Sequence, residues 1–562
     1  MFGIGAHNQI ARGQATHHRL ETTPIQFESC HSLSNLGLLL LIPFLLETGL
    51  LSYQSHYEEL DKGYYFLDFI ILFLSFMYLS RIKNPEQLKH LSPGEFGKLL
   101  GVDRIPEAKC LRKKIKQICS QDKTEQWNMS LASYWSKEEE NEFYYIDGHV
   151  QVYSGNKAHL GKKHIARQKL CLPGIQEFWV NNHDGLPYFY VTGQVNEKLL
   201  EMLNDHIIPS LLTEMPQKYS RQQLDADADL ARFTVVFDRE GYSPSYFSSL
   251  WETHRVAVIT YRKNVKDTWP EEDFQSYTFE MHGGIAEMRL SERPIELNGV
   301  PMREVRRLTK DGHQTSVITN NKKLTKEMTA YYMFSRWTQE NFFKYLRQEY
   351  DFDRIAQYIV EQIDNDFLVV NPEYNNLCYR LKKLREKISR RRAKLYKLQE
   401  ENIHDNLDNT AQYIKKQTEA LEELNLSLEV ETELVRQRKN IAYKIKIEDM
   451  PKHLRYTKLN IESKRFLNII KMICYRAETS CANLLAEYYK KQKHEKRALV
   501  KSIINTSGDL IADYQNKTLT AKLYTQSNPR MNNAVSRICE LLNQTETKFP
   551  ETNLILKYEL VT

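Results

Sequence analysis

Two aspartates in the chain stand directly after apolar runs that are typical of buried strands. Asp147 ends the run in YYIDGH, and Asp238 ends the run in VVFDREG. We expect each at the exposed end of a strand, where open sheets build their sites. If the two strands are neighbours, the carboxylates converge, and two like charges that close are costly unless a cation holds them. Carboxylate oxygens of this kind suit Mg²⁺ or Mn²⁺.

A third carboxylate, Glu340, lies in RWTQENFFKYLRQEYDFD, which we expect to be a helix. Arg336 precedes Glu340 by about one helical turn and Arg347 follows it by about two, so the three side chains lie near one face. A carboxylate flanked by two guanidinium groups suits a metal-bound phosphodiester. The alternative is an ordinary surface ion pair between Arg336 and Glu340.

The stretch that must position these acids changes from strand patterns to helix patterns. EFYYIDGHVQVYSG predicts a strand, a turn and a strand, and LPYFYVTGQV predicts a third strand. Helical and strand patterns then alternate, and short alternating runs from about 264 to 325 indicate a β-rich insertion. Helical pattern returns through residue 355. This order predicts an α/β domain over 141–375, in which helices pack against a mixed sheet.

Residues 1–140 predict a helical domain. Its apolar stretches, 36–51 and 64–83, are either membrane segments or two buried helices packed as a hairpin. We expect buried helices, because each stretch carries an acidic residue. Residues 91–115 predict two short helices joined at Gly101, either a helix-turn-helix that binds DNA or a plain helical hairpin.

Residues 376–450 predict a basic helical arm with apolar residues at three-four spacing. HDNLDN (404–409) predicts the turn into its second helix, which runs from about Thr410 to Val435. The remaining segment, 451–562, predicts a mixed α/β domain with strands around the helix NNAVSRICELLN.

Three consecutive arginines, Arg390, Arg391 and Arg392, lie within this arm, and Arg391 stands where an apolar residue is due. Successive residues of a helix point in different directions, so at least one of the three faces any partner, either a DNA backbone or another subunit. A solvated helix face is the alternative.

Composition leaves several functions open. The net charge of the 562 residues is only +6, but dense basic runs such as YRLKKLREKISRRRAKLYK make a polyanionic partner plausible. The eight cysteines are scattered singly, without a C-x-x-C pair or histidines at zinc spacing. Reduced thiols in a cytoplasmic protein are the simplest account of them.

Taken in order, the three acidic motifs resemble the DDE transposases of bacterial insertion sequences. That resemblance implies an RNase H-like catalytic core, with two aspartates on strands and a glutamate on a later helix. The long interval before Glu340 fits members with a β-rich insertion. Some members carry a Y-x2-R-x3-E-x6-K signature around the glutamate. Here Arg336 and Glu340 match it, Arg347 replaces the lysine, and Met333 replaces the tyrosine.

The resemblance implies that Asp147, Asp238 and Glu340 are catalytic and bind two divalent ions, Mg²⁺ or Mn²⁺. It also implies cleavage at the ends of an insertion sequence and joining of the freed 3′-hydroxyl to target DNA. The partner would be double-stranded DNA, bound by a homodimer in the bacterial cytoplasm and associated with the nucleoid. Our candidates for DNA contact are Arg336, Arg347, Arg239, Lys157, Lys162, Arg390, Arg391 and Arg392.

Three other functions fit parts of the same pattern. One is a transposase-derived DNA-binding protein that no longer cuts, and another is a generic RNase H-like nuclease that does not join strands. The third is a nucleic-acid protein held on a membrane by residues 64–80. We also expect His149, two residues after Asp147, to be a structural histidine.

Overall fold

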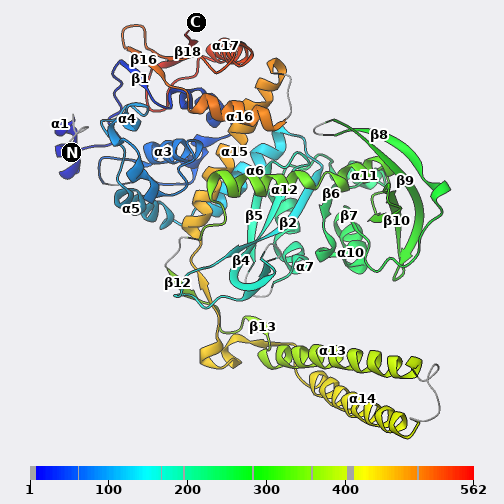
Figure 1. Cartoon of the computed structure of the whole chain (residues 1–562). Helices are drawn as coiled ribbons and strands as arrows, with labels where there is room; N and C mark the ends of the chain where they lie inside the picture. The colour runs from blue at the N-terminus through cyan, green and yellow to red at the C-terminus, as the bar shows by residue number, and fades with distance from the viewer. Residues whose placement is uncertain are drawn as a thin grey trace.

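A mixed β-sheet forms the middle of the molecule, with helices packed around it (Figure 1). The computed structural model describes residues 8–60, 62–165, 168–193, 197–281, 284–355, 359–401, 410–489 and 493–561. Over these ranges the sheet has ten strands in the order β3-β4-β2-β6-β7-β11-β10-β9-β8, with β5 paired to β4. The strands are β2 (Phe143–Val152), β3 (Lys162–Ile165), β4 (Leu170–Asn181), β5 (Pro187–Gly193), β6 (Phe233–Phe237), β7 (Val256–Tyr261), β8 (Gln275–Met281), β9 (Gly284–Leu297), β10 (Val300–Leu308) and β11 (Gln314–Thr319).

Strand direction divides this sheet into three parts. Strands β5, β4 and β2 are antiparallel neighbours, whereas β6 is parallel to β2 and β7 is parallel to β6. Strands β8 to β11 form an antiparallel extension that joins the sheet through β11 and β7. The mixed α/β sheet and the β-rich insertion expected from the sequence are therefore present.

Two details of this region differ from the sequence prediction. The turn expected inside EFYYIDGHVQVYSG is wrong, because β4 pairs with β2 without interruption from Tyr145 to Val152. Strand β4 itself was not anticipated, since Pro173 and Gly174 lie inside it. These two residues mark the point where β4 changes partner: Pro173 pairs with β3 and Gly174 pairs with β2.

At β2 and β6 both faces of the sheet are covered by helices, and apolar residues on successive positions of these strands point to opposite sides. On one side Tyr145 and Val236 pack with Met333 of α11 (Lys326–Phe334), which is followed by α12 (Trp337–Tyr350). On the other side the ring of Phe237 lies 6.0 Å from that of Phe247 in α10 (Pro244–His254). The helices α7 (Leu199–Met202), η4 (Leu203–Ile207), α8 (Ile208–Thr213) and α9 (Arg221–Ala226) connect β5 to β6.

The two ends of the chain form one further body rather than two. Strand β1 (Cys30–Leu33) pairs with β16 (Gly508–Asp513), which continues into β17 (Thr518–Leu523) and β18 (Ile555–Leu560). The helices here are η1 (Leu36–Leu41), α2 (Ile42–Glu47), η2 (Leu50–Ser55), α3 (Leu67–Leu79), α4 (Pro93–Lys98), α5 (Ala108–Cys119), α6 (Thr124–Glu138), α15 (Glu462–Tyr488), α16 (Lys493–Ile504) and α17 (Pro529–Gln544). The expected segments 1–140 and 451–562 thus share one sheet and one core.

Helix α15 joins this body to the central sheet. It packs against α2, α3, α5 and α6, and its Lys464 makes a buried ion pair with Glu177 of β4 at 3.0 Å. The Glu177 carboxylate also accepts hydrogen bonds from Gln151 at 2.9 Å and Trp179 at 3.1 Å. The ion pair gives each buried charge an opposite charge, and Glu177 has hydrogen-bond donors as well, which a buried carboxylate needs.

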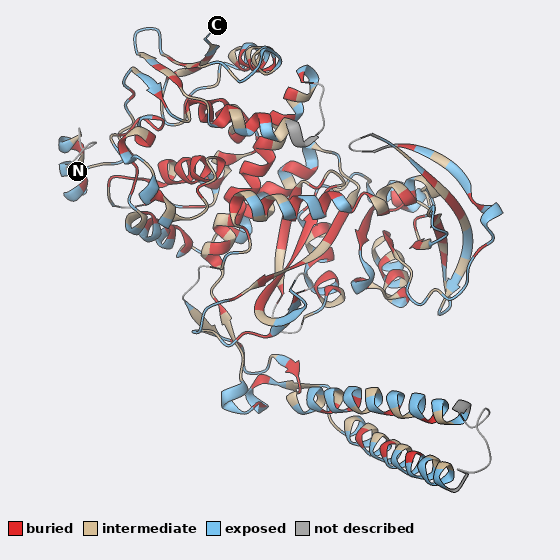
Figure 2. Ribbon diagram, viewed as in Figure 1, coloured by how far each residue is buried: buried red, intermediate tan, exposed pale blue. Residues whose placement is uncertain are grey.

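The apolar stretches near the N-terminus lie inside this body, as expected. Twelve of the thirteen residues of α3 are buried, and the exception is Asp68 in its first turn (Figure 2). The first stretch is divided at Gly49, whose φ of 86° ends α2 before η2 begins. No helix in the described part of the chain combines the length and apolar composition that a bilayer crossing requires.

Helices α4 and α5 occupy the stretch 91–115. The segment between them, residues 99–107, is longer than the three-to-four-residue turn of a helix-turn-helix. The apolar side of α5, with Leu111 and Ile118, is buried in the core. The plain helical hairpin therefore describes this stretch better than a DNA-binding helix-turn-helix.

A long two-helix arm, α13 (Pro372–Glu401) and α14 (Thr410–Lys439), projects from the body (Figure 1). It is attached through the two-stranded ribbon of β13 (Leu368–Val370) and β14 (Lys444–Lys446). Leu377 and Leu381 pack against Leu434 between the helices. The two helices of the arm confirm the expected pattern, and the predicted turn 404–409 lies outside the described residues.

The close approach of the two chain ends makes a testable prediction at Gly37 in η1. A Cβ atom at Gly37 would lie 1.7 Å from the carbonyl oxygen of Ile503 in α16. We expect Gly37→Ala to lower the free energy of unfolding by about 1–3 kcal/mol, because backbone must move to admit the methyl group. Urea denaturation of the full chain measures it.

The matched control is Gly13→Ala, since nothing lies within 4 Å of a Cβ there. Gly13 is in the helix α1 (Gln9–Thr16), so alanine should be neutral or raise stability by up to about 1 kcal/mol. Equal effects at both positions would contradict the shared body of the two chain ends.

Candidate active site

Asp147 lies in the middle of β2 and faces α12. Side chains two residues apart on a strand share a face, so Tyr145, Asp147 and His149 point the same way. The Tyr145 hydroxyl donates to the carbonyl of Tyr332 at 2.8 Å, and the His149 ring stacks on Phe343 at 4.8 Å between centroids. Both partners belong to the α11–α12 segment, which places Asp147 beneath it.

Asp238 emerges beside Asp147 because of the register between the two strands. Ile146 of β2 pairs with Phe237 of β6 in parallel, so the next residue on each strand is one of the two aspartates. Asp238 shares its face with Val236, which packs against Tyr145. Its carboxylate accepts from the backbone N–H of Arg239 at 2.6 Å. The expected convergence of the two strand acids is thus present.

One part of the prediction for Asp147 is wrong. Asp238 does follow the end of its strand, but β2 continues for five residues beyond Asp147. The reason is that β4 pairs with β2 along this whole stretch, whereas β6 stops at Phe237. Asp147 is therefore open on the side that β6 leaves free, and its exposed fraction is 27%.

Glu340 comes from α12, and its neighbour Gln339 fixes that helix to the sheet. The fully buried Gln339 amide donates to the carbonyls of Tyr145 at 3.3 Å and Trp179 at 3.1 Å, and to Asn181 Oδ1 at 2.8 Å. These acceptors lie on β2 and β4. Glu340 is exposed and lines an open cavity of about 350 Å³ together with Asp147, His149, His164 and Arg347.

Asp238, Glu340 and Arg336 lie close enough to Asp147 for their charges to affect its pKa. The pKa of Asp147 is raised to about 6, mainly by burial; the negative charges of Asp238 and Glu340 contribute to this rise, while Arg336 and the Gly148 N–H oppose it. Arg336 Nη2 lies 3.5 Å from Asp147 Oδ2. Among the described residues Arg336 pairs with Asp147 and not with Glu340, so the simple surface pair is not what forms.

The three carboxylates offer oxygen donors only, which suits hard cations such as Mg²⁺ or Mn²⁺. Their mutual repulsion at Asp147 is the condition that a bound cation would relieve. Within the described residues, however, no three acidic, histidine or cysteine side chains already form a ligand cluster. The carboxylate oxygens suit such an ion, and the three acids lie on the same face of the sheet. Arg336 supplies the positive charge beside Asp147.

The predicted DNA-contact residues divide into two groups. Arg347 lines the cavity, Arg239 holds its guanidinium 5.5 Å from the ring of Tyr261, and Arg336 is 8% exposed with its Nε lacking a hydrogen-bond partner. Lys157 and Lys162 are exposed, on the loop before β3 and on β3 itself. Of these five, the three arginines lie near the acids, and the two lysines lie on the segment that leads to His164 of the cavity.

The other group, Arg390, Arg391 and Arg392, lies on the distant arm (Figure 1). Arg391 donates to the Ser427 hydroxyl of α14 and lies 3.2 Å from Glu423. This contact explains the interruption in the apolar spacing of α13, because the facing position of α14 is polar as well. Arg391 holds the arm together, whereas Arg390 and Arg392 are exposed.

Two residues near the acids were not identified from the sequence. Tyr261 ends β7, and its pKa is raised mainly by burial, with the charges of Asp238 and Glu340 adding to the rise and those of Arg336 and Arg239 opposing it. His164 of β3 lines the cavity. Tyr261 follows the apolar run VAVIT, which is the same signal that marked the two aspartates; His164 had no such signal.

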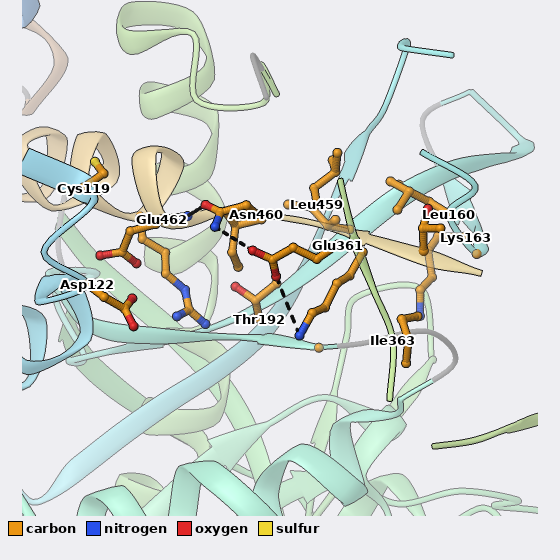
Figure 3. A pocket seen from close by; sticks show the side chains of 18 of the residues that line it. Cys119, Asp122, Leu160, Lys163, Thr192, Glu361, Ile363, Leu459, Asn460 and Glu462 are labelled. Atoms are coloured by element: carbon orange, nitrogen blue, oxygen red, sulfur yellow. Dashed lines mark hydrogen bonds and ion pairs between the residues drawn. The ribbon is translucent and has the colours of Figure 1, made fainter. Parts of the chain in front are cut away.

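A larger cavity, of about 470 Å³, lies elsewhere and contains none of the three acids (Figure 3). Several of its polar side chains pair with one another: Asn460 donates to Glu361 at 2.7 Å, and Lys458 lies 3.8 Å from the same carboxylate. Glu462 accepts from the backbone N–H of Thr124 at 3.1 Å. The cavity with Asp147 and Glu340 is therefore the better candidate for chemistry.

The Gln339 contacts predict that Gln339→Met destabilises the protein. Methionine has nearly the same volume but cannot donate to the three acceptors, which stay buried. We expect a loss of about 1–3 kcal/mol in the free energy of unfolding, measured by urea denaturation. Gln348→Met, on the exposed side of α12, is the control and should change little. Equal stability of the two variants would remove Gln339 as the anchor of Glu340.

The raised pKa of Asp147 makes a prediction about pH. The pKa of Asp147 is about 6 in the folded protein and 3.8 in the unfolded chain, so the unfolded chain releases its proton first. The folded protein therefore loses stability as the pH rises from about 3.8 to about 6. Asp147→Asn removes the charge. Without divalent ions, its stability relative to the natural protein should rise by up to about 3 kcal/mol between acid and mildly alkaline pH.

Thermal unfolding across this pH range measures the difference. Asp366→Asn, a matched change at an exposed position, should show no such trend. A constant difference between Asp147→Asn and the natural protein would contradict a strained carboxylate at this site.

Comparison with known proteins identifies the family of the chain. A search of the curated proteins finds no match. A family model described as "Transposase protein" matches residues 3–562, almost the whole chain, so both the acid-bearing sheet and the arm lie within the match. The chain therefore belongs to this family of transposases.

Proposed function

We propose that this transposase is of the DDE type and that Asp147, Asp238 and Glu340 form its catalytic site. The observation that carries the proposal is that the three acids lie on one face of the sheet. Two emerge from adjacent parallel strands at the same level, and the third comes from the helix that covers that face. This is the arrangement of two strand aspartates and a later helical glutamate that an RNase H-like core would provide.

The chain's own residues would divide the work as follows. The three carboxylates would hold two divalent ions, which supply charge stabilisation and activate water or a 3′-hydroxyl for in-line displacement. Asp147 must be deprotonated for this role, so the site favours a pH above its pKa of about 6. Arg336 and Arg347, on either side of Glu340, would orient the phosphodiester through hydrogen bonds to its oxygens.

DNA contact would extend outward from the cavity. Arg239, Lys157 and Lys162, which are exposed, would meet phosphates beyond the reacting one. His149 has a different task, because its ring stacks on Phe343 and its Nε2 lies 2.5 Å from Asp353. It would keep β2 and α12 together. Since two ends must be cut and joined, two copies of the site would act on one DNA complex.

The decisive experiment is a strand-transfer assay. Purified protein is incubated with Mg²⁺ or Mn²⁺ and DNA that carries the ends flanking its own gene. We expect cleaved and joined products from the natural protein. Glu340→Gln should lower their yield at least about 100-fold, because it removes a charge from the ion-binding set while retaining the shape.

Glu272→Gln is the control, an identical change at an exposed position in the β-rich insertion. Its products should equal those of the natural protein. Joining that survives Glu340→Gln would exclude Glu340 from the site. DNA binding without cleavage would favour a transposase-derived DNA-binding protein, and cleavage without joining would favour a generic nuclease.

A further inference from the structure

The arm of α13 and α14 carries two exposed rows of charge of opposite sign, a basic row on α13 and an acidic row on α14. Along α13 the basic residues recur at alternating steps of three and four, which places them in one row on a helix. The row consists of Arg380, Lys383, Lys387, Arg390, Lys394 and Lys397, all exposed. It occupies a flank of the helix away from the leucines that face α14.

A matching acidic row runs along α14 at the same alternating spacing. Its acidic members are Glu419, Glu422, Glu429 and Glu433, and Leu426 occupies the position between Glu422 and Glu429; all five are exposed. Leu426 in the middle of the row is 62% exposed, and the nearby Val430 is 49% exposed. Aliphatic side chains flanked by charges at heptad spacing are typical of a helix that packs against another helix.

The two rows lie at the same height along the arm. Arg385 of α13 pairs with Glu431 at 2.6 Å, and Arg391 lies 3.2 Å from Glu423. The middle of the basic row, between Lys387 and Arg390, is therefore level with the middle of the acidic row near Leu426. Within one arm the two rows cannot pair with each other, because other residues fill the contact between the helices.

We propose that the arm docks with the arm of a second copy of this chain, so that α13 of each copy packs along α14 of the other. Both contacts are then identical, as a two-fold dimer requires. Each basic row meets an acidic row at matching height, and Leu426 and Val430 become covered. The product is a four-helix bundle that holds two copies together without DNA. This inference goes beyond the proposed chemistry and does not depend on it.

The basic row could instead bind the DNA backbone. Two features of the arm count against this alternative. The acidic row of α14 lies on the same arm and would repel phosphates. A cationic partner would suit this row, and DNA cannot supply one. An exposed leucine within that row also has no use in backbone contact, whereas a second arm covers it.

The test is the mass of the full chain in solution without DNA, measured by analytical ultracentrifugation at low salt. We expect twice the 66.4 kDa of one chain. The acidic row is reversed by Glu419→Lys, Glu422→Lys and Glu429→Lys, and the basic row by Lys387→Glu, Arg390→Glu and Lys394→Glu. Among the described residues, none of these six is in an ion pair, so the fold of a single chain should tolerate both changes.

Each reversed variant alone places like charges across both contacts, and its dissociation constant should rise at least about tenfold. Mixing the two variants restores opposite charges in both contacts, so a dimer of one copy of each should form. This rescue also shows that both variants are folded. Lys382→Glu with Arg392→Glu changes charge on another side of α13 and should leave the dimer intact.

Three results would overturn the proposal: a monomer at micromolar concentrations, a dimer that neither reversal weakens, and variants that do not pair when mixed. If reversal of the basic row leaves the mass unchanged but weakens binding to a short DNA duplex, the row is a DNA surface instead.

Discussion

The parallel pairing of β2 with β6 is the constraint on which the rest of this molecule depends. Its register places two aspartates next to each other at the point where β6 ends and β2 continues. A shift of one residue would turn Asp147 to the opposite face and separate it from α12. The apolar alternation that packs both faces of the sheet therefore also decides which side chains meet in the cavity.

The second requirement is that a helix reach this point from the other side. Gln339 performs this task with a buried amide whose three acceptors lie on two strands of the sheet. Its position directly before Glu340 links the placement of the third acid to the packing of α12. This packing buries the Asp147 carboxyl, which raises its pKa above that of a solvated carboxyl and makes its charged form less favourable. Binding of a cation would offset this cost, and carboxyls with a perturbed pKa are common at functional sites.

The body is held together by a large apolar core, and the arm by a narrow apolar contact between two helices. In the body the two chain ends wrap around α15, and the resulting core extends from Ala11 to Tyr558. The arm has a narrow apolar seam supplemented by charged pairs such as Arg385 with Glu431. A seam of this kind leaves most of each helix exposed, so the outer faces are free to carry rows of charge. Some charges on the arm therefore join its two helices, whereas those of the outer rows take no part in this contact.

The sequence by itself determined the alternation of strands and helices, the β-rich insertion and the two-helix arm, and it singled out three acids that the fold places on one face. These follow from local periodicity, which each segment carries alone. It did not reveal β4, whose Pro173 and Gly174 conceal a change of partner strands, nor the single core shared by both chain ends. Only the tertiary structure decided that Asp147 lies within its strand, that Arg336 pairs with Asp147, and that Tyr261 and His164 lie nearby. The physical reason is that register and strand order depend on contacts between segments far apart in the chain, which no local pattern records.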